Sequence, residues 1–203
     1  MRIGVFGGTF DPIHNAHLFV AESARILEQL DRVLFVPTSN HHYRDEPQAD
    51  AAHRCAMILG AIASNLGFAL DDADLRESAT GYTADLLPRL HAKYPQAKLT
   101  FIIGADSLVN APWMRFDEVL QSLEGFVIAP RPGVRADALA RVIAAVPAPL
   151  RERVSSLNIP EIPESGTLVR TLISQGRSIR YLVPEPVWHY IVAHRLYGFD
   201  AGE

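Results

Sequence analysis

Apolar residues in this chain form short unbroken runs, and between these runs they recur at helical spacing. An apolar run that ends at glycine or proline indicates a strand buried on both faces, whereas apolar residues three and four positions apart indicate a helix with one buried face. The predicted strands are 2–6, 32–37, 98–104, 125–130 and one near 154–159, with a shorter apolar run at 68–70. The predicted helices are 16–30, 49–66, 83–94, 135–146, 165–176 and 185–196.

Strands alternate with helices along the whole chain, which is typical of a parallel sheet with helices on both faces. The predicted fold is therefore α/β, a Rossmann-like doubly wound parallel sheet closed by C-terminal helices. No internal repeat and no linker is evident, so residues 1–203 are expected to form a single domain. Pro88 conflicts with the third predicted helix because proline removes one backbone hydrogen bond.

Composition narrows the function classes. The chain has 203 residues, of which 48% are hydrophobic and 21% charged, so it can form an ordinary globular core. Its formal net charge is −4, and Lys and Arg form no run, so nucleic acid is not an expected partner. No apolar run reaches the length of a membrane span. Cys55 is the only cysteine, which fits a reducing, cytoplasmic location. Homo-oligomerisation stays open.

The most informative stretch is GGTFDPIHNAH, residues 7–17, directly after the first predicted strand. In a doubly wound sheet a ligand binds where the first strand meets the following helix. Gly7 and Gly8 lie at that point, and glycines let backbone N–H groups approach a phosphate closely. His14 and His17 are three residues apart at the start of the next helix, so both rings can lie on one face beside the glycine turn.

Other interpretations compete for this stretch. Glycine-rich turns after strands are common, and His17 could be a buried helix-face residue. The two histidines could bind a metal, but no third ligand has suitable spacing, so no protein-bound metal site is predicted. Asp11 precedes a proline, which favours a turn-shaping role over ligand contact. The spacing matches neither the G-x-G-x-x-G fingerprint nor the P-loop.

The stretch resembles the G-x-F-D-P-x-H-x-G-H signature of the nucleotidyltransferase superfamily, with Ala16 where the family usually has glycine. Other segments resemble the bacterial nicotinate mononucleotide adenylyltransferases, in the same order as in that family, with Gly81 in place of a serine. These segments are AHRCAMI (52–58), GYTADLL (81–87), FIIGADSLVNAPWMRFDEVL (101–120), VIAPRPG (127–133), ESGTLVR (164–170) and SIRYLVPEPVWHYI (178–191).

The resemblance implies an enzyme that joins ATP and nicotinate mononucleotide into nicotinate adenine dinucleotide and pyrophosphate, a step in NAD biosynthesis. It implies that Mg²⁺ enters with ATP, held mainly by phosphate oxygens and water. His14, His17 and Arg170 take the catalytic roles. The implied ATP-binding residues are Gly8, Thr9, Phe10, His17, Gly104, Asp106, Ser165, Thr167 and Arg170.

The residues around 165–170 also suggest an anion site without the family. Ser165 is a suitable N-cap, and the N–H groups of Thr167 and Leu168 are expected to be free at the helix start. Arg170 lies one turn further and can reach an anion held there. An ordinary capped helix with a surface arginine explains the same residues equally well.

The implied acceptor-binding residues lie in three separate segments. Arg44 stands in a loop where the family often has a lysine, and Trp113 could equally be a core residue. Asp85 is expected to face solvent, because a carboxylate aimed at the acceptor would repel its acid group. The implied set is Asn40, Arg44, Tyr82, Thr83, Trp113 and Met114.

Two alternatives remain at this stage. The first is a related enzyme with nicotinamide mononucleotide or phosphopantetheine as acceptor, although the Trp113 segment is not expected in the phosphopantetheine enzymes. The second is a nucleotide-binding regulatory module without catalysis, which the presence of both His14 and His17 disfavours.

Overall fold

The computed structural model describes residues 1–38, 47–76 and 78–199. Within this part of the chain, six strands form one sheet in the order β3-β2-β1-β4-β5-β6, and every neighbouring pair is parallel. The strands are β1 (Arg2–Gly8), β2 (Arg32–Pro37), β3 (Phe68–Leu70), β4 (Lys98–Gly104), β5 (Gly125–Ala129) and β6 (Val154–Ser156).

The six predicted helices are all present, with ends that differ by a few residues from the prediction. They are α1 (Asn15–Leu27), α2 (Ala51–Ile62), α3 (Thr83–Lys93), α6 (Ala136–Ala145), α8 (Gly166–Ser174) and α9 (Glu185–Ala193). The sequence did not predict α4 (Ala105–Asn110), α5 (Phe116–Gln121), α7 (Ala148–Arg151) or the 3₁₀ turn η1 (Leu196–Gly198), because elements this short carry too little periodicity.

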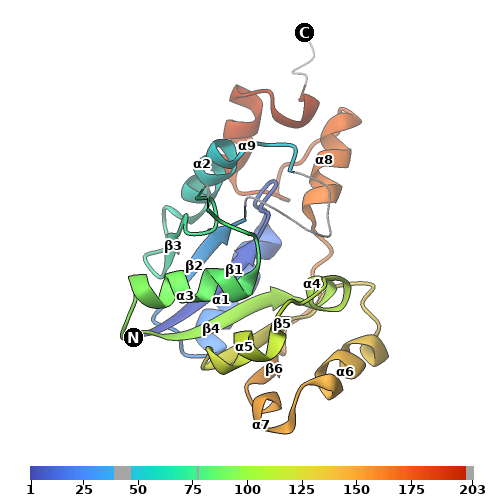
Figure 1. The fold of residues 1–203 in the computed structure, drawn as a ribbon. Coiled ribbons are helices and arrows are strands. Elements are labelled where there is room, and N and C mark those ends of the chain that lie inside the picture. The colour runs from blue at the N-terminus through green and yellow to red at the C-terminus, as the bar shows by residue number, and fades with distance from the viewer. Residues whose placement is uncertain (39–46, 77, 200–203) are drawn as a thin grey trace.

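The strand order places a switch point beside β1. The chain proceeds from β1 outward through β2 to β3, and then crosses back to add β4 on the other side of β1 (Figure 1). In such sheets a crevice opens at the carboxyl ends of the two central strands. Gly8 and Gly104 end these two strands, so the fold brings the glycine turn and the β4–α4 junction together.

Each face of the sheet carries its own hydrophobic core. One core includes Phe6, Phe35 and Ile102 from the strands and buried residues of α1, α2, α8 and α9. The other includes Val5 and Phe101 with buried residues of α3, α4 and α5. Successive strand residues point to opposite faces, so apolar positions in both phases are needed to bury a strand twice. The prediction of a two-sided sheet is confirmed (Figure 1).

Helix α3 runs through Pro88. Proline has no N–H and cannot complete the bond to the carbonyl of Ala84, a local loss that a helix interior normally avoids. Leu86, Leu87 and Leu90 are buried against the sheet, and this tertiary packing holds the helix together. The start of α3 is thereby fixed at the crevice.

Candidate active site

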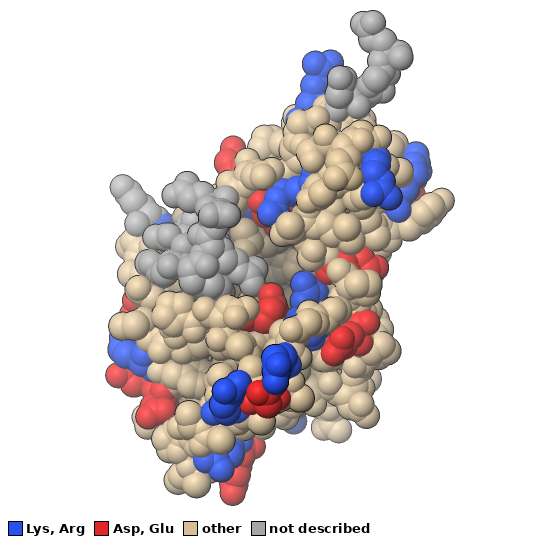
Figure 2. Space-filling model, turned by 90° about the vertical axis from the view of Figure 1, so that its right-hand side faces the viewer, with Lys and Arg blue, Asp and Glu red and all other residues tan. Residues whose placement is uncertain are grey.

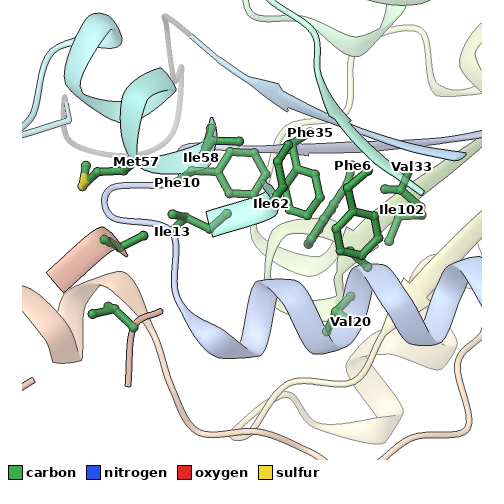
Figure 3. Packing of buried hydrophobic residues seen from close by; sticks show 14 of the residues in the cluster. Phe6, Phe10, Ile13, Val20, Val33, Phe35, Met57, Ile58, Ile62 and Ile102 are labelled. Atoms are coloured by element: carbon green, nitrogen blue, oxygen red, sulfur yellow. The ribbon is translucent and has the colours of Figure 1, made fainter. Parts of the chain in front are cut away.

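The turn after β1 exposes backbone while burying its aromatic side chain. Phe10 has a left-handed backbone (φ 51°), which is uncommon for a bulky residue, and its side chain is 1% exposed. Its ring packs against Phe6 and Phe35, with Ile13 and Ile58 nearby (Figure 3). Phe10 also lines a large cavity over the turn, so it can offer that cavity only its backbone.

His14 and His17 form the start of α1. His14 is the N-cap, and its backbone N–H donates to Nδ1 of His17 (3.3 Å). Because that nitrogen accepts a hydrogen bond, neutral His17 carries its proton on Nε2, which is then a donor. Both rings line the cavity and stack with centroids 3.7 Å apart.

The electrostatic surroundings keep His14 neutral. Its side chain is almost completely buried, and burial together with the positive charge of Arg131 lowers the pKa of His14 to about 3. Arg131 follows β5 and lies 3.7 Å from the carboxylate of Asp106. It also donates to the backbone oxygen of Glu164 (3.2 Å). Arg131 lines the cavity, although the R-P-G turn in the sequence does not by itself indicate a site residue.

The start of α8 packs directly on the β1–α1 loop. A Cβ on Gly166 would lie 2.8 Å from the backbone oxygen of Asp11, so only glycine permits this approach. Arg170 donates to the same oxygen (2.6 Å) and faces the cavity. The Ser165 side chain accepts from the N–H of Leu168 (3.1 Å), as an N-cap does. The expectation that the Leu168 N–H is free was therefore wrong.

Asp11 links four segments of the chain. Its buried carboxylate accepts from the N–H groups of Gln48 (2.8 Å) and Ala49 (3.1 Å) and from the hydroxyl of Tyr197 (2.8 Å). Arg170 Nη1 lies 3.8 Å from Oδ2 of this carboxylate. Asp11 therefore shapes the loop, as the sequence favoured, but it does so through long-range contacts.

Arg54 explains the H-R-x-x-M segment on α2. It is 2% exposed and donates to the backbone oxygens of Thr9 (2.7 Å), Thr38 (2.9 Å) and Ala49 (3.2 Å). Thr9 follows β1, Thr38 follows β2, and Ala49 precedes α2. This buried guanidinium thus supports the glycine turn from beneath.

The large cavity gathers the predicted ATP-binding residues at one place. It lies over the carboxyl ends of β1 and β4, and its lining includes the start of α8. Figure 2 shows a face of the molecule that is hollowed near its centre, with acidic and basic side chains interspersed around the hollow. The predicted residues that line the cavity are Gly8, Thr9, Phe10, His14, His17, Gly104, Asp106, Ser165, Thr167 and Arg170.

A second cavity lies beside the first. Tyr82, Thr83, Trp113 and Met114 all line it, and Gly7, Gly8, Thr9 and Ser107 line both cavities. The predicted acceptor residues Asn40 and Arg44 lie outside the described residues. The two cavities meet at the glycine turn.

Trp113 serves the core and the second cavity at once. Its ring packs edge-on against Phe101 (6.3 Å between centroids) and Phe126 (5.5 Å), and at a tilt against Phe116. Its Nε1 is buried and has no hydrogen-bond partner within the described part of the chain. Packing on one side therefore fixes the indole beside the cavity.

The two carboxylates near the second cavity differ in their surroundings. Asp85 does not line it, because its carboxylate accepts from Thr80 (2.6 Å) and pairs with Arg115. Asp74 does line it, is 5% exposed and hydrogen-bonds with Thr38. Burial raises the pKa of Asp74 to about 6. No sequence pattern indicates Asp74, which lies in a short polar stretch without periodicity.

The described residues contain neither a metal-binding cluster nor a membrane-spanning helix. No group of three His, Cys, Asp or Glu side chains there could hold a metal ion. No helix in the same ranges combines the length and hydrophobicity that a membrane crossing needs.

The parallel sheet, the crevice at its switch point and the two joined cavities define a Rossmann-like nucleotide-binding protein. Comparison with known proteins narrows this class. Residues 5–162 match the family model described as cytidylyltransferase-like. A Thermomicrobium roseum protein named "Probable nicotinate-nucleotide adenylyltransferase" is 41% identical over 97% of this chain and 91% of its own length. A Symbiobacterium thermophilum protein of the same name is 39% identical over 97% and 95%. This chain belongs to the cytidylyltransferase-like nucleotidyltransferases and, among them, to the nicotinate-nucleotide adenylyltransferase family.

Solved structures agree on the fold. The nicotinic acid mononucleotide adenylyltransferase of Plasmodium falciparum, in a complex with NaAD, superposes with a TM-score of 0.80 and covers 99% of both chains at 20% identity. The same Plasmodium protein in complex with APC gives a TM-score of 0.79. At this identity the likeness concerns the fold, and it confirms the predicted Rossmann-like architecture.

Proposed function

We propose that this protein transfers the adenylyl group of ATP to nicotinate mononucleotide, releasing pyrophosphate and forming nicotinate adenine dinucleotide for NAD biosynthesis. The observation that carries the proposal is the meeting of two cavities at Gly7, Gly8 and Thr9, beside His14 and His17. One cavity has the donors for a triphosphate, and the other has an aromatic wall for a pyridine ring. The family membership supports the same reaction.

ATP occupies the larger cavity in this proposal. The backbone of Gly8, Thr9 and Phe10 faces its phosphates, and Gly104 and Asp106 face the adenosine. Arg170 and the N–H groups at the start of α8, beside Ser165 and Thr167, hold the β- and γ-phosphates. Arg131, which lies 3.7 Å from the Asp106 carboxylate and lowers the pKa of His14, adds positive charge to the same cavity.

Nicotinate mononucleotide occupies the second cavity. Trp113 stacks on the pyridine ring, since its indole is held at the wall by Phe101, Phe116 and Phe126. Thr83 and the backbone of Tyr82 and Met114 offer donors to the nicotinate carboxylate. These groups lie around the start of α3 and the turn before α5. Asn40 and Arg44, which follow β2 in the sequence, are also proposed to contact the acceptor.

The chemical step is an in-line displacement at the α-phosphorus of ATP. A phosphate oxygen of the acceptor forms a bond to the α-phosphorus while the bond to the β-bridging oxygen breaks, and pyrophosphate leaves. No covalent enzyme intermediate is needed, so the chain mainly positions the reactants and stabilises charge. His17 donates from Nε2 to the phosphate oxygens, and neutral His14 stacks behind it.

The described residues are consistent with a Mg²⁺ ion that arrives bound to ATP and is not held by a cluster of protein side chains. The Asp11 carboxylate is occupied by hydrogen bonds, and the described residues offer no cluster of three ligands. Phosphate oxygens and water would hold the ion, which neutralises charge on the leaving pyrophosphate when bound. We further propose a single 1–203 domain that acts in the cytoplasm, with ATP and nicotinate mononucleotide rather than nucleic acid as its partners.

The test is pyrophosphate release from ATP and Mg²⁺ with a panel of acceptors. Nicotinate mononucleotide, nicotinamide mononucleotide and phosphopantetheine are compared at equal concentrations. The proposal expects the highest kcat/KM with nicotinate mononucleotide. A higher value with another acceptor would reassign the substrate, and ATP binding without release on any acceptor would indicate a regulatory module.

A further inference from the structure

The last described turn of the chain contacts Asp11, a residue that lines the larger cavity. The Tyr197 hydroxyl donates to Oδ1 of Asp11 (2.8 Å) across 186 positions of sequence. Tyr197 belongs to η1, and its ring packs against the core cluster that α8 and α9 share. The contact thus joins the C-terminal end of the described chain to the loop that carries His14.

The backbone around Tyr197 adopts an unusual conformation. Tyr197 (φ 60°) and Arg195 (φ 48°) are both left-handed, and Gly198 (φ 75°) follows. A left-handed conformation is unfavourable for a residue other than glycine, so it persists only where other contacts hold it. The hydrogen bond to Asp11 is one such contact, because it is made by a side chain that the turn directs inward.

Asp11 connects Tyr197 with Arg170, a residue that lines the cavity. One of its carboxylate oxygens accepts from Tyr197 and Ala49, while its backbone oxygen accepts from Arg170 Nη1 (2.6 Å). Loss of the Tyr197 bond would leave a buried carboxylate oxygen with one partner fewer, and the loop could then move toward a new donor. The nearest guanidinium is Arg170, at 3.8 Å from the other carboxylate oxygen.

We infer that Tyr197 is a positioning residue for ATP, which holds Asp11 in place so that Arg170 stays directed at the β- and γ-phosphates. The inference rests on the proposed function for the identity of the reaction, but the geometry concerns the ATP side alone. Burial and the Asp11 charge raise the pKa of Tyr197, so its hydroxyl remains a donor throughout the working pH range. The turn η1 thereby affects ATP binding without contacting ATP.

The experiment is Tyr197→Phe in the full chain, with Tyr190→Phe as the matched control. Tyr190 lies on α9 and its hydroxyl contacts His53 (3.0 Å), so this variant loses a hydroxyl from the same end of the molecule without affecting Asp11. Tyr197→Phe is expected to lower kcat/KM for ATP about tenfold, the low end for a hydrogen bond to a charged group. KM for the acceptor is expected to stay within twofold, and Tyr190→Phe to match the wild type.

A double-variant comparison separates positioning from stability alone. In an Arg170→Ala background, Tyr197→Phe is expected to add less than twofold, since the group it positions is already gone. A full tenfold effect in that background, or unchanged ATP kinetics in the single variant, would overturn the inference. Calorimetric titration of ATP without acceptor measures the same loss directly. That readout stands even if the chain releases pyrophosphate with none of the three acceptors.

Discussion

The backbone N–H of His14 donates to the ring nitrogen Nδ1 of His17, one helical turn further along α1. This bond satisfies one of the unpaired amides at the helix start and also sets the tautomer of His17. In the proposed mechanism, helix capping and phosphate binding therefore use the same side chain. The His14 ring stacks on it at 3.7 Å and stays neutral, so no positive charge opposes the alignment of the pair.

Two substitutions at His17 separate its capping role from its role at the phosphates. His17→Ala is expected to lower kcat by about 10²–10³, the cost of losing one preorganised donor. It should also lower stability by about 0.5–2 kcal/mol through the lost cap. His17→Gln keeps an acceptor for the His14 N–H, as a capping box does, and is expected to restore stability but not turnover.

The measurements are steady-state pyrophosphate release and thermal unfolding. His189→Ala is the control, because His189 lies on an exposed face of α9 and pairs only loosely with Glu185 (3.6 Å). Wild-type turnover in a stable His17→Ala protein would remove His17 from the mechanism.

Substitution of Gly166 tests the ATP site by steric displacement, without removing a charge. Gly166→Ala places a Cβ 2.8 Å from the backbone oxygen of Asp11, so the start of α8 must move away from the β1–α1 loop. KM for ATP is expected to rise about tenfold or more, since a small displacement of positioning groups is costly. KM for the acceptor should change little.

Gly60→Ala is the matched control for a glycine-to-alanine change. Gly60 lies inside α2, where the new Cβ would meet Pro186 at an ordinary 3.4 Å. Alanine favours a helix by up to about 1 kcal/mol over glycine, so this variant should melt at the same or a higher temperature. Equal ATP kinetics in Gly166→Ala and Gly60→Ala would show that the close approach has no role in binding.

Most of the fold could be predicted because buried parallel strands leave a plain pattern. The runs 32–37 and 98–104 coincide with β2 and β4, since a strand buried on both faces must be apolar throughout. The glycine turn could also be predicted, for a different reason: a phosphate site needs the backbone to approach closely, and glycine permits this. The short helices α4 and α5 escaped prediction because six residues complete fewer than two turns.

The supporting residues could not be predicted because their partners are distant in sequence. Asp11 and Tyr197 are 186 positions apart, and only the packing of α8, α9 and η1 brings them together. Arg131 lines the larger cavity and contacts Asp106 and Glu164 there. No local sequence pattern indicates these contacts. Asp74 is buried beside the second cavity, where it hydrogen-bonds with Thr38. From sequence alone, a polar residue outside any periodic pattern is predicted to be exposed to solvent.

His14 and Asp74 give opposite pH dependences of stability. The pKa of His14 is about 3 in the folded protein against 6.5 unfolded, so the unfolded chain binds a proton that the folded one refuses. Its contribution to stability is complete above pH 6.5 and is lost as pH falls toward 3. The pKa of Asp74 is about 6 against 3.8, so the folded protein keeps a proton that the unfolded chain has released. Its contribution is complete below pH 3.8 and is lost as pH rises to 6.

Urea unfolding of His14→Asn and Asp74→Asn at pH 4.5 and pH 8 checks both signs. Asp74→Asn is expected to raise the free energy of unfolding at pH 8 by about 1–3 kcal/mol and to change it less at pH 4.5. His14→Asn should reduce the loss of stability between pH 8 and pH 4.5 by about 3 kcal/mol. Parallel pH profiles for wild type and both variants would contradict the assigned burial.

The acceptor site makes the most specific chemical prediction. Nicotinate differs from nicotinamide in having a carboxylate instead of a neutral amide, and the Asp85 charge is directed away from the cavity by Thr80 and Arg115. Asp74 does line the cavity, and because burial raises its pKa to about 6, the preference for the acid is expected to be larger below pH 6 than above it. Two or three donors around Thr83 and Met114, each worth about 1.5–3 kcal/mol, support an acid-over-amide preference on the order of a hundredfold. The measurement is kcat/KM for the two mononucleotides at equal ATP and Mg²⁺.

Trp113→Ala should weaken both acceptors alike, because stacking acts on the pyridine ring and not on its substituent. Thr83→Ala should instead reduce the preference, since the hydroxyl donates to the carboxylate alone. Trp113→Phe keeps an aromatic wall against Phe101 and Phe126 and separates stacking from loss of core volume. A wild-type ratio near one would reject acid selectivity while leaving adenylyl transfer in place. A Trp113→Ala variant that weakens only one acceptor would show that the indole contacts the substituent, and its buried Nε1 would then be the donor.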